Sequence, residues 1–238
     1  MHTSPDQYQD IRDAVRALCA QFPDEYHRKV DEKRGYPEEF VDALTKAGWM
    51  AALIPQEYGG SGLSMAEASV IMEEINRSGG NSGACHGQMY VMNSIVRSGS
   101  DAQKNMLLPK IATGEVLPTA VFTEPDTGSD LGSLRTRATP TNSGWRIDGN
   151  KTWITHPVRA DVMTLLARTN PDETGYKGLS MFLAEKPRGS DDNPFPAKGM
   201  TGGEIEVLGY RGMKEYEIRF EDFEVKAESL LGGIEGQG

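Results

Sequence analysis

The spacing of apolar residues changes near Gly114, and this change constrains the fold more than any other feature of the chain. Before it, apolar side chains recur every three or four residues, as Met89, Met92 and Val96 do, which predicts a helix over 84–96 with the methionines in its core. After it, short apolar runs stand between turn residues, as strands do. The sequence therefore predicts an α+β fold, in which an all-α helical domain precedes a small antiparallel β-barrel or sandwich domain. The predicted domains are residues 1–117 and residues 118–238.

The helical half carries its own start and stop signals. Ser64 with Glu67, and again Ser100 with Gln103, have the spacing of a capping box, in which each side chain satisfies a backbone N–H at the start of a helix. Residues 37–48 begin with proline and acids and end with lysine and glycine, the order that favours a short helix. We therefore expect helices over 37–48 and directly after each capping serine.

The second half contains several β-prone segments. Residues 145–147 and 152–154 flank the triplet Asp148-Gly149-Asn150, and a turn-rich triplet between two such segments predicts a hairpin. Residues 163–167 and 179–183 are further short apolar strands.

A change of alternation marks the last predicted strand. Tyr216, Ile218 and Phe220 alternate with polar residues, and the apolar positions then shift to Phe223 and Val225. One extra residue in a strand produces such a shift, so we expect a β-bulge near residues 221 and 222.

Composition and charge exclude several classes of function. The 238 residues are 37% hydrophobic and 25% charged, with a formal net charge of −10. Nucleic acids and anionic membranes need clustered lysine and arginine, so neither is an expected partner. A small polyanionic ligand is still compatible with the sequence, because backbone N–H groups, hydroxyls and a few arginines can hold it locally.

The chain carries no sign of export or of a metal centre. Its apolar runs are far shorter than the roughly 20 residues that cross a bilayer, and its start lacks a basic region followed by an apolar one, so we expect no membrane span and a cytoplasmic location. Cys19 and Cys85 form no CxxC pair, which predicts buried thiols and neither a zinc site nor a disulfide framework.

The loop over residues 123–130 is the strongest candidate for ligand binding. Pro125 restricts φ, Gly128 allows close backbone approach, and Thr123 and Ser129 place hydroxyls beside backbone N–H groups. These features suit an anion or a flavin. A loop of this composition is also a common ordinary turn, so the loop alone leaves both interpretations open.

The wider sequence resembles the acyl-CoA dehydrogenases. The pattern TEP-x-x-GSD at 123–130 is followed by NKTWIT at 150–155, in the order and at about the separation found in that family. Further matching stretches are residues 54–62, 108–115, 220–225 and 230–233. The resemblance covers nearly all of the chain. Within the family, residues 122–138 and 199–213 look most like the bacterial methylsuccinyl-CoA dehydrogenases.

This resemblance implies a cofactor, a substrate and a set of contacts. It implies α,β-dehydrogenation of an acyl-CoA thioester by FAD, with an electron-transfer flavoprotein as the expected acceptor and a homo-oligomeric full-length form. The implied flavin contacts are Phe122, Thr123, Gly128, Ser129, Trp153, Ile154 and Thr155. Ser129 is also implied to contact the CoA thioester. Without the resemblance, Trp153 and Ile154 also fit an ordinary strand core, and Thr155 a residue of high β-propensity.

The resemblance also implies where the catalytic base lies. In this family a carboxylate removes the substrate's α-proton while the β-hydrogen leaves as hydride. The family continues past the position of Gly238 into a helical domain that carries this glutamate, so we expect no catalytic residue and no metal in this chain. Glu124 is expected to support the loop and not to act as the base.

Two alternatives use the same fold. Acyl-CoA oxidases and flavin monooxygenases share this arrangement and differ in how the reduced flavin meets oxygen. A non-catalytic FAD- and CoA-binding subunit, completed by a partner that supplies the helices, is the third interpretation.

Overall fold

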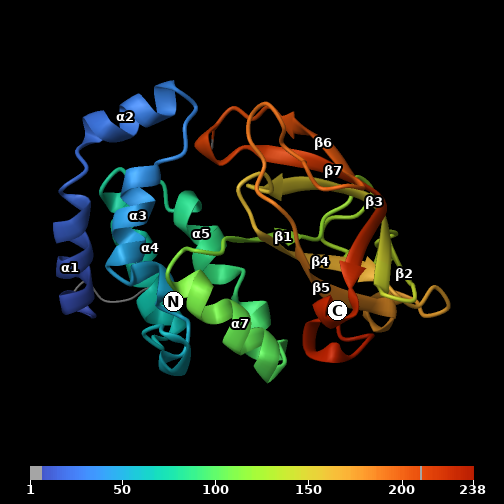
Figure 1. The fold of residues 1–238 in the computed structure, drawn as a ribbon. Helices are drawn as coiled ribbons and strands as arrows, with labels where there is room; N and C mark the ends of the chain where they lie inside the picture. Colours follow the sequence, from blue (N-terminus) through green and yellow to red (C-terminus); the bar gives the residue numbers. More distant parts are fainter. Residues whose placement is uncertain (1–6, 210) are drawn as a thin grey trace.

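The computed structural model describes residues 7–209 and 211–238, and it places a helical half beside a strongly curled sheet (Figure 1). The helices are α1 Gln9–Cys19, α2 Asp24–Glu32, α3 Glu38–Lys46, α4 Met65–Arg77, α5 Gly83–Tyr90, α6 Asn93–Ser98 and α7 Asp101–Ala112. The strands are β1 Pro118–Val121, β2 Arg137–Pro140, β3 Gly144–Thr155, β4 Val162–Arg168, β5 Leu179–Glu185, β6 Met200–Ile205 and β7 Glu215–Lys226. This architecture confirms the predicted fold class, whereas the division at residues 117 and 118 stays a prediction.

The two predicted capping boxes are present. Ser64 begins α4 by accepting from the N–H of Glu67, whose carboxylate accepts from the N–H of Ser64 at 2.7 Å. Ser100 and Gln103 make the same reciprocal pair at the start of α7. Both helices therefore start where the sequence predicts, because each cap satisfies backbone groups that the helix itself leaves unpaired.

The stretch 84–96 forms two helices, α5 and α6, where the spacing predicts one. Met89 and Met92 are both fully buried, as expected, but they enter different hydrophobic clusters. Met89 packs in the cluster formed with α1, α3 and α4, and Met92 packs in the cluster formed with α7 and the sheet. The interruption lets consecutive turns face two different partners.

A buried ionic network joins the first and fourth helices. Arg12 and Arg16 both bind the carboxylate of Glu74, with Nη1–Oε1 and Nε–Oε2 distances of 2.6 Å. Glu74 is inaccessible to solvent, and a buried carboxylate is stable only when its oxygens are paired. The network therefore fixes α1 against α4 at the outer edge of the helical half.

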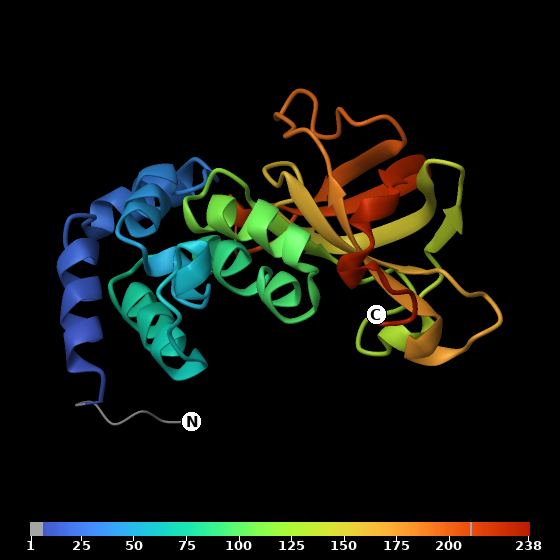
Figure 2. The same ribbon diagram turned by 60° about the horizontal axis from the view of Figure 1, so that its bottom comes forward.

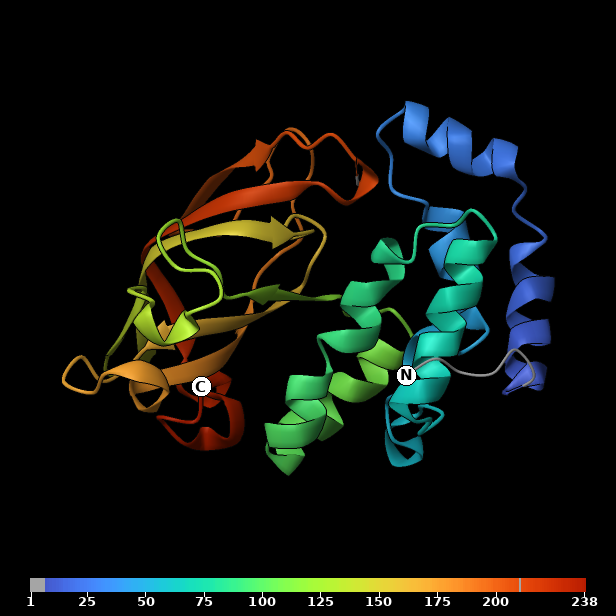
Figure 3. The ribbon, with the colours of Figure 1, turned by 180° about the vertical axis from the view of Figure 1, so that it is seen from behind.

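The sheet is mixed and its strand order is β1-β4-β2-β3-β7-β6, with β5 paired to β4. β1 and β2 run parallel to β4, and the other pairs are antiparallel, so the sheet is mixed where the sequence predicts an antiparallel one. The sheet curls around a core that includes Ile147, Phe182 and Phe220, and Figure 2 shows the curvature. Seen from behind, β1 leads from the helices into the sheet beside α5 and α7 (Figure 3), so both halves meet along this strand.

The predicted hairpin at residues 148–150 is wrong. β3 is one continuous strand through Gly149, and it pairs with β2 on one side and with β7 on the other. Gly149 has φ +156°, and a Cβ there would collide with Thr136 Oγ1 and lie 2.7 Å from the Thr136 Cα. The glycine is therefore required for close packing across the sheet, and turns favour glycine for a different reason.

The predicted bulge in β7 is confirmed. Ile147 pairs with Phe223 and Gly149 with Phe220, so β7 has one residue more than β3 in this interval. Asp222 has φ +52°, and its N–H donates to Asp148 Oδ1 at 2.8 Å. The extra residue moves the apolar side chains back onto the core face.

Replacing Gly149 with alanine should destabilise the fold by about 2 kcal/mol or more, because the methyl group collides with Thr136 and the backbone stays in a region that L-residues avoid. Urea unfolding of Gly149→Ala measures this loss. Gly203→Ala in β6 is the matched control, since an added Cβ there meets nothing within 4 Å. Equal stability of the two variants would contradict the role given to Gly149.

Candidate functional site

The two motifs singled out in the sequence lie side by side. The N–H of Thr152 donates to the carbonyl of Thr123 at 2.9 Å, and Lys151 Nζ donates to the carbonyl of Phe122 at 2.8 Å. The backbone of the loop after β1 is therefore attached to β3 at Lys151 and Thr152. Phe122 and Thr123 remain partly exposed at this junction.

Glu124 supports the loop from within. Its carboxylate accepts from the backbone N–H groups of Arg135 and Thr136 at 2.7 and 2.8 Å and from Lys151 Nζ at 3.1 Å. Burial alone would raise the pKa of Glu124, but the Lys151 charge and these hydrogen bonds outweigh it and hold the pKa below its usual value. Glu124 is therefore ionised at neutral pH and fully occupied with partners inside the protein.

Trp153 projects from a bulge in β3. Lys151 pairs with Ile218 and Ile154 with Tyr216, so two residues of β3 lie opposite one of β7. Trp153 has φ +57° and is 56% exposed. A large residue with positive φ is strained, so the surroundings hold the indole outward against a local energetic cost.

The other motif residues divide into buried and exposed groups. Ile154 is 1% exposed and belongs to the strand core, so only its backbone can meet a ligand. Gly128 and Ser129 are exposed, and a Cβ added at Gly128 would meet nothing within 4 Å. Gly128 has no positive φ, so it is not needed for a left-handed backbone conformation. Its lack of a side chain leaves the surface of the loop open.

Thr155 occupies the end of β3 beside a carboxylate that sequence reasoning missed. Its Oγ1 lies 2.8 and 3.0 Å from the two carboxylate oxygens of Glu215. Burial raises the pKa of Glu215, and the Thr155 hydrogen bond offsets part of that rise. In the sequence, Glu215 is one more polar residue before the alternating run of β7, so only the strand register reveals this pair.

Thr155 also lines a small cavity of about 80 Å³ between α5 and the sheet. Its wall is mainly apolar and includes Gly87 and Val91 from α5 and Ala120 from β1. A complete cofactor needs far more space, since ligand pockets usually hold about 300–1,000 Å³. The two motifs therefore meet on an open surface, with Thr155 reaching this interior space.

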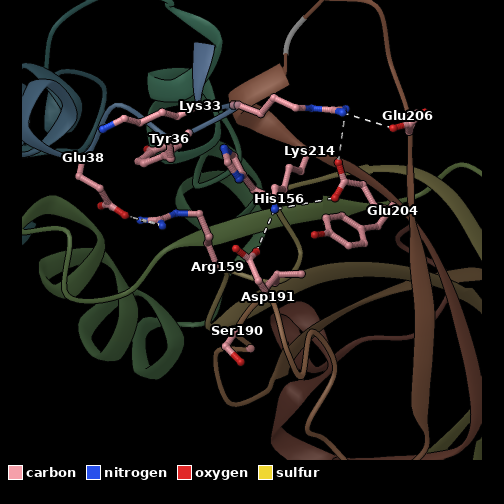
Figure 4. A pocket seen from close by; sticks show the side chains of 16 residues that line it. Lys33, Tyr36, Glu38, His156, Arg159, Ser190, Asp191, Glu204, Glu206 and Lys214 are labelled. Carbon is pink, nitrogen blue, oxygen red and sulfur yellow. Dashed lines mark hydrogen bonds and ion pairs between the residues drawn. The ribbon is translucent and has the colours of Figure 1, made fainter. Parts of the chain in front are cut away.

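A larger cavity of about 780 Å³ opens between the α2–α3 connection and the ends of β6 and β7 (Figure 4). Ion pairs surround it. Arg159 Nη1 lies 2.6 Å from Glu38, and Lys214 Nζ lies 2.9 Å from Asp191. The first pair joins the helical half to a loop of the sheet, and the second joins two segments of the sheet half. The charges that line the cavity therefore largely neutralise one another.

Three side chains line both cavities: Tyr36, His156 and Arg159. The Arg159 guanidinium lies 4.1 Å from the Tyr36 ring centre, and the His156 ring contacts the same tyrosine edge-on. Burial, followed by the Arg159 charge, lowers the pKa of His156 to about 3. His156 is therefore neutral, and the three residues form a fixed partition between the two cavities.

The described residues contain neither a group of three metal-ligating side chains nor a membrane-spanning helix. Among the side chains described in residues 7–85, 87–209 and 212–238, no three His, Cys, Asp or Glu groups are placed so as to hold a metal ion. The helices described there include none that is long and apolar enough to cross a membrane. Cys19 and Cys85 are buried free thiols, and burial raises the pKa of Cys85 to about 12.

Comparison with known proteins identifies relatives of both halves. The family description "Acyl-CoA dehydrogenase, N-terminal domain" matches residues 5–115, and "Acyl-CoA dehydrogenase, middle domain" matches residues 119–223. The (2S)-methylsuccinyl-CoA dehydrogenase of Cereibacter sphaeroides is 59% identical over 203 residues, which is 85% of this chain and 37% of that protein.

Solved structures agree with these matches. The glutaryl-coenzyme A dehydrogenase in its glutaryl-CoA complex superimposes with a TM-score of 0.87 at 28% identity, over 100% of this chain and 59% of that one. The FAD complex of PigA superimposes with a TM-score of 0.84 at 25% identity, over 100% of this chain and 60% of that one. The chain therefore spans between about a third and three fifths of the length of these relatives.

Replacing Lys151 with methionine should destabilise the protein by about 3 kcal/mol, because it leaves the buried Glu124 carboxylate without its cation. Chemical denaturation at pH 7 measures the loss. The control is Lys226→Met, which breaks an exposed pair with Glu185 at 3.9 Å and should cost less than about 1 kcal/mol.

The Lys151→Met penalty should also depend on pH. The pKa of Glu124 is lowered on folding, so the stability that it contributes is present above the unfolded pKa near 4.3 and is lost as pH falls through the lower folded value. We expect the penalty to shrink below about pH 4. A penalty that stays constant from pH 7 to pH 3 would contradict an ionised Glu124.

Proposed function

The chain belongs to the acyl-CoA dehydrogenase family, and on that premise we propose that it forms the flavin- and thioester-binding part of an FAD-dependent acyl-CoA dehydrogenase. The exposed indole of Trp153, held on a strained bulge beside the 122–129 loop, carries this proposal. Strain at an exposed aromatic residue is uncommon unless the position is used.

The side chains at this surface suit FAD. The isoalloxazine ring needs a flat apolar face, which the Trp153 indole provides, and polar partners at its edge, which the hydroxyls of Thr123 and Thr155 provide. The pyrophosphate needs N–H and hydroxyl donors, and Ser129 offers them on an exposed loop. We assign flavin contacts to these residues together with Phe122, Gly128 and the backbone of Ile154, and thioester contact to Ser129.

FAD, when bound, supplies the acceptor for the hydride that leaves the β-carbon of the thioester. This chain would orient the ring through Trp153 and Thr155 and hold the loop through Glu124 and Lys151. Glu124 is unsuited to remove the substrate's α-proton, because its oxygens are buried and already bonded to three donors. The base is expected from the part of the longer relatives that this chain does not match.

The substrate and acceptor are proposed by similarity. A short branched dicarboxylic thioester such as (2S)-methylsuccinyl-CoA is the first candidate, since the relative of that name is 59% identical. An electron-transfer flavoprotein is the proposed acceptor, and a homo-oligomer is the proposed form of the longer protein. The cytoplasmic location stays a prediction.

Trp153→Ala should weaken FAD binding about tenfold, because one aromatic stacking contact is worth roughly 1–3 kcal/mol. Titration of the chain with FAD, followed by quenching of flavin fluorescence, measures the change. Ile234→Ala removes another exposed apolar side chain and should leave the affinity unaltered. An equal loss in both variants would argue against a flavin at Trp153.

The FAD-saturated chain of 238 residues should bleach slowly or not at all when mixed anaerobically with (2S)-methylsuccinyl-CoA, because positioned general-base catalysis contributes about 10² to 10⁴-fold. Fusion to the remaining portion of the Cereibacter sphaeroides relative should restore rapid bleaching. Rapid bleaching by the chain alone that disappears in Glu124→Gln would identify Glu124 as the base and refute our assignment.

The same fusion protein distinguishes a dehydrogenase from an oxidase, a monooxygenase and a non-catalytic subunit. Once bleached, a dehydrogenase should return its electrons to an electron-transfer flavoprotein faster than to oxygen. Faster reoxidation by oxygen would favour an oxidase or monooxygenase of this fold. Binding of FAD and thioester without any bleaching in the fusion would favour the non-catalytic subunit.

A further inference from the structure

Thr155 and Glu215 lie directly opposite each other at the ends of β3 and β7. The Thr155 hydroxyl is within 2.8 and 3.0 Å of the two carboxylate oxygens. The backbone carbonyl of Thr155 is fixed as well, because Thr119 Oγ1 donates to it at 2.6 Å. The position of the hydroxyl is therefore determined from both sides, and the remaining freedom is the direction of its single proton.

The carboxylate controls that direction. An ionised carboxylate only accepts hydrogen bonds, so the Thr155 hydroxyl must donate to it and can offer a ligand only its lone pairs. A protonated Glu215 can donate to Thr155 instead, which frees the threonine proton for the ligand. The protonation state of Glu215 thus decides whether Thr155 presents a donor or an acceptor.

Burial and the Thr155 hydrogen bond dominate the environment of the Glu215 carboxyl. It is 8% exposed, and among the side chains that the structure describes no lysine or arginine forms an ion pair with it. Directly before β7, Lys214 is paired with Asp191 and Glu204. Next to Thr155, His156 is neutral. Thr155 is therefore the polar group that Glu215 acts on.

We propose that Glu215 is a positioning residue that sets the Thr155 hydroxyl as an acceptor toward the flavin and thereby favours reduced over oxidised FAD. The inference rests on the proposed function, in which Thr155 meets the polar edge of the isoalloxazine ring. Oxidised flavin presents ring nitrogens that accept hydrogen bonds, whereas the reduced ring carries an N–H that donates. An accepting Thr155 matches the reduced ring.

A simple charge effect predicts the opposite sign. A negative carboxylate near the ring opposes the addition of electrons, so its removal alone would favour reduction. Removal of Glu215 as an orienting acceptor frees the Thr155 proton for the oxidised ring and disfavours reduction. The direction of the shift therefore distinguishes orientation from charge.

The test measures the ratio of oxidised to reduced FAD in the FAD-saturated chain against a reference dye at pH 8. Glu215→Met should shift this equilibrium about tenfold toward oxidised FAD, which is about 30 mV for a two-electron couple. In the Thr155→Val background the same substitution should produce no shift or a shift of opposite sign. Glu217→Met, which removes an exposed carboxylate of the same strand, should leave the ratio unaltered.

Two further measurements keep the outcome decisive. Glu215→Gln preserves the shape of the side chain and replaces Glu215→Met if circular dichroism shows that Glu215→Met is unfolded. We expect Glu215→Gln to shift the ratio in the same direction by a smaller factor. The difference between the wild type and Glu215→Met, measured at the same pH, should narrow as the pH is lowered from 8, because the Glu215 carboxyl becomes protonated. Equal shifts in the wild-type and Thr155→Val backgrounds would overturn the role given to Glu215 and leave the proposed function intact. A chain that binds no FAD at any concentration would overturn both.

Discussion

The buried contact between Lys151 and Glu124 is the interaction on which the candidate site depends. Lys151 lies in the middle of a central strand and is almost inaccessible, yet its ammonium reaches the Phe122 carbonyl and the Glu124 carboxylate of the loop. Two buried charges are tolerated only while they stay paired and hydrogen-bonded. The loop therefore cannot leave the strand without leaving the Lys151 ammonium buried and unpaired.

This attachment explains how the chain maintains a strained tryptophan. Trp153 sits between Lys151, which anchors the loop, and Ile154, which is fixed in the strand core. With both neighbours held, the backbone at Trp153 remains in a conformation that an isolated strand would avoid. The backbone from which the indole projects is therefore already set before a ligand binds, which reduces the ordering cost of binding.

The junction of the two halves adds a second level of organisation. Tyr36 from the helical half packs against His156 and Arg159 from the sheet, and Arg159 in turn pairs with Glu38. Because burial lowers the pKa of His156 to about 3, its ring is neutral over the physiological range. The small cavity at Thr155 and the larger charged cavity share Tyr36, His156 and Arg159 as lining residues, so both halves contribute to the wall between them.

Local chemistry was enough to predict the capping boxes at Ser64 and Ser100, the buried methionines, the bulge at Asp222 and the family to which the motifs belong. The sequence misassigned Gly149, because a glycine needed for contact with Thr136 leaves the same local signal as a glycine in a turn. Only the tertiary structure placed Thr155 opposite Glu215 and held Trp153 outward. Those relations come from pairing between distant strands, and strand register depends on the packing of the whole sheet, which no short stretch of sequence records.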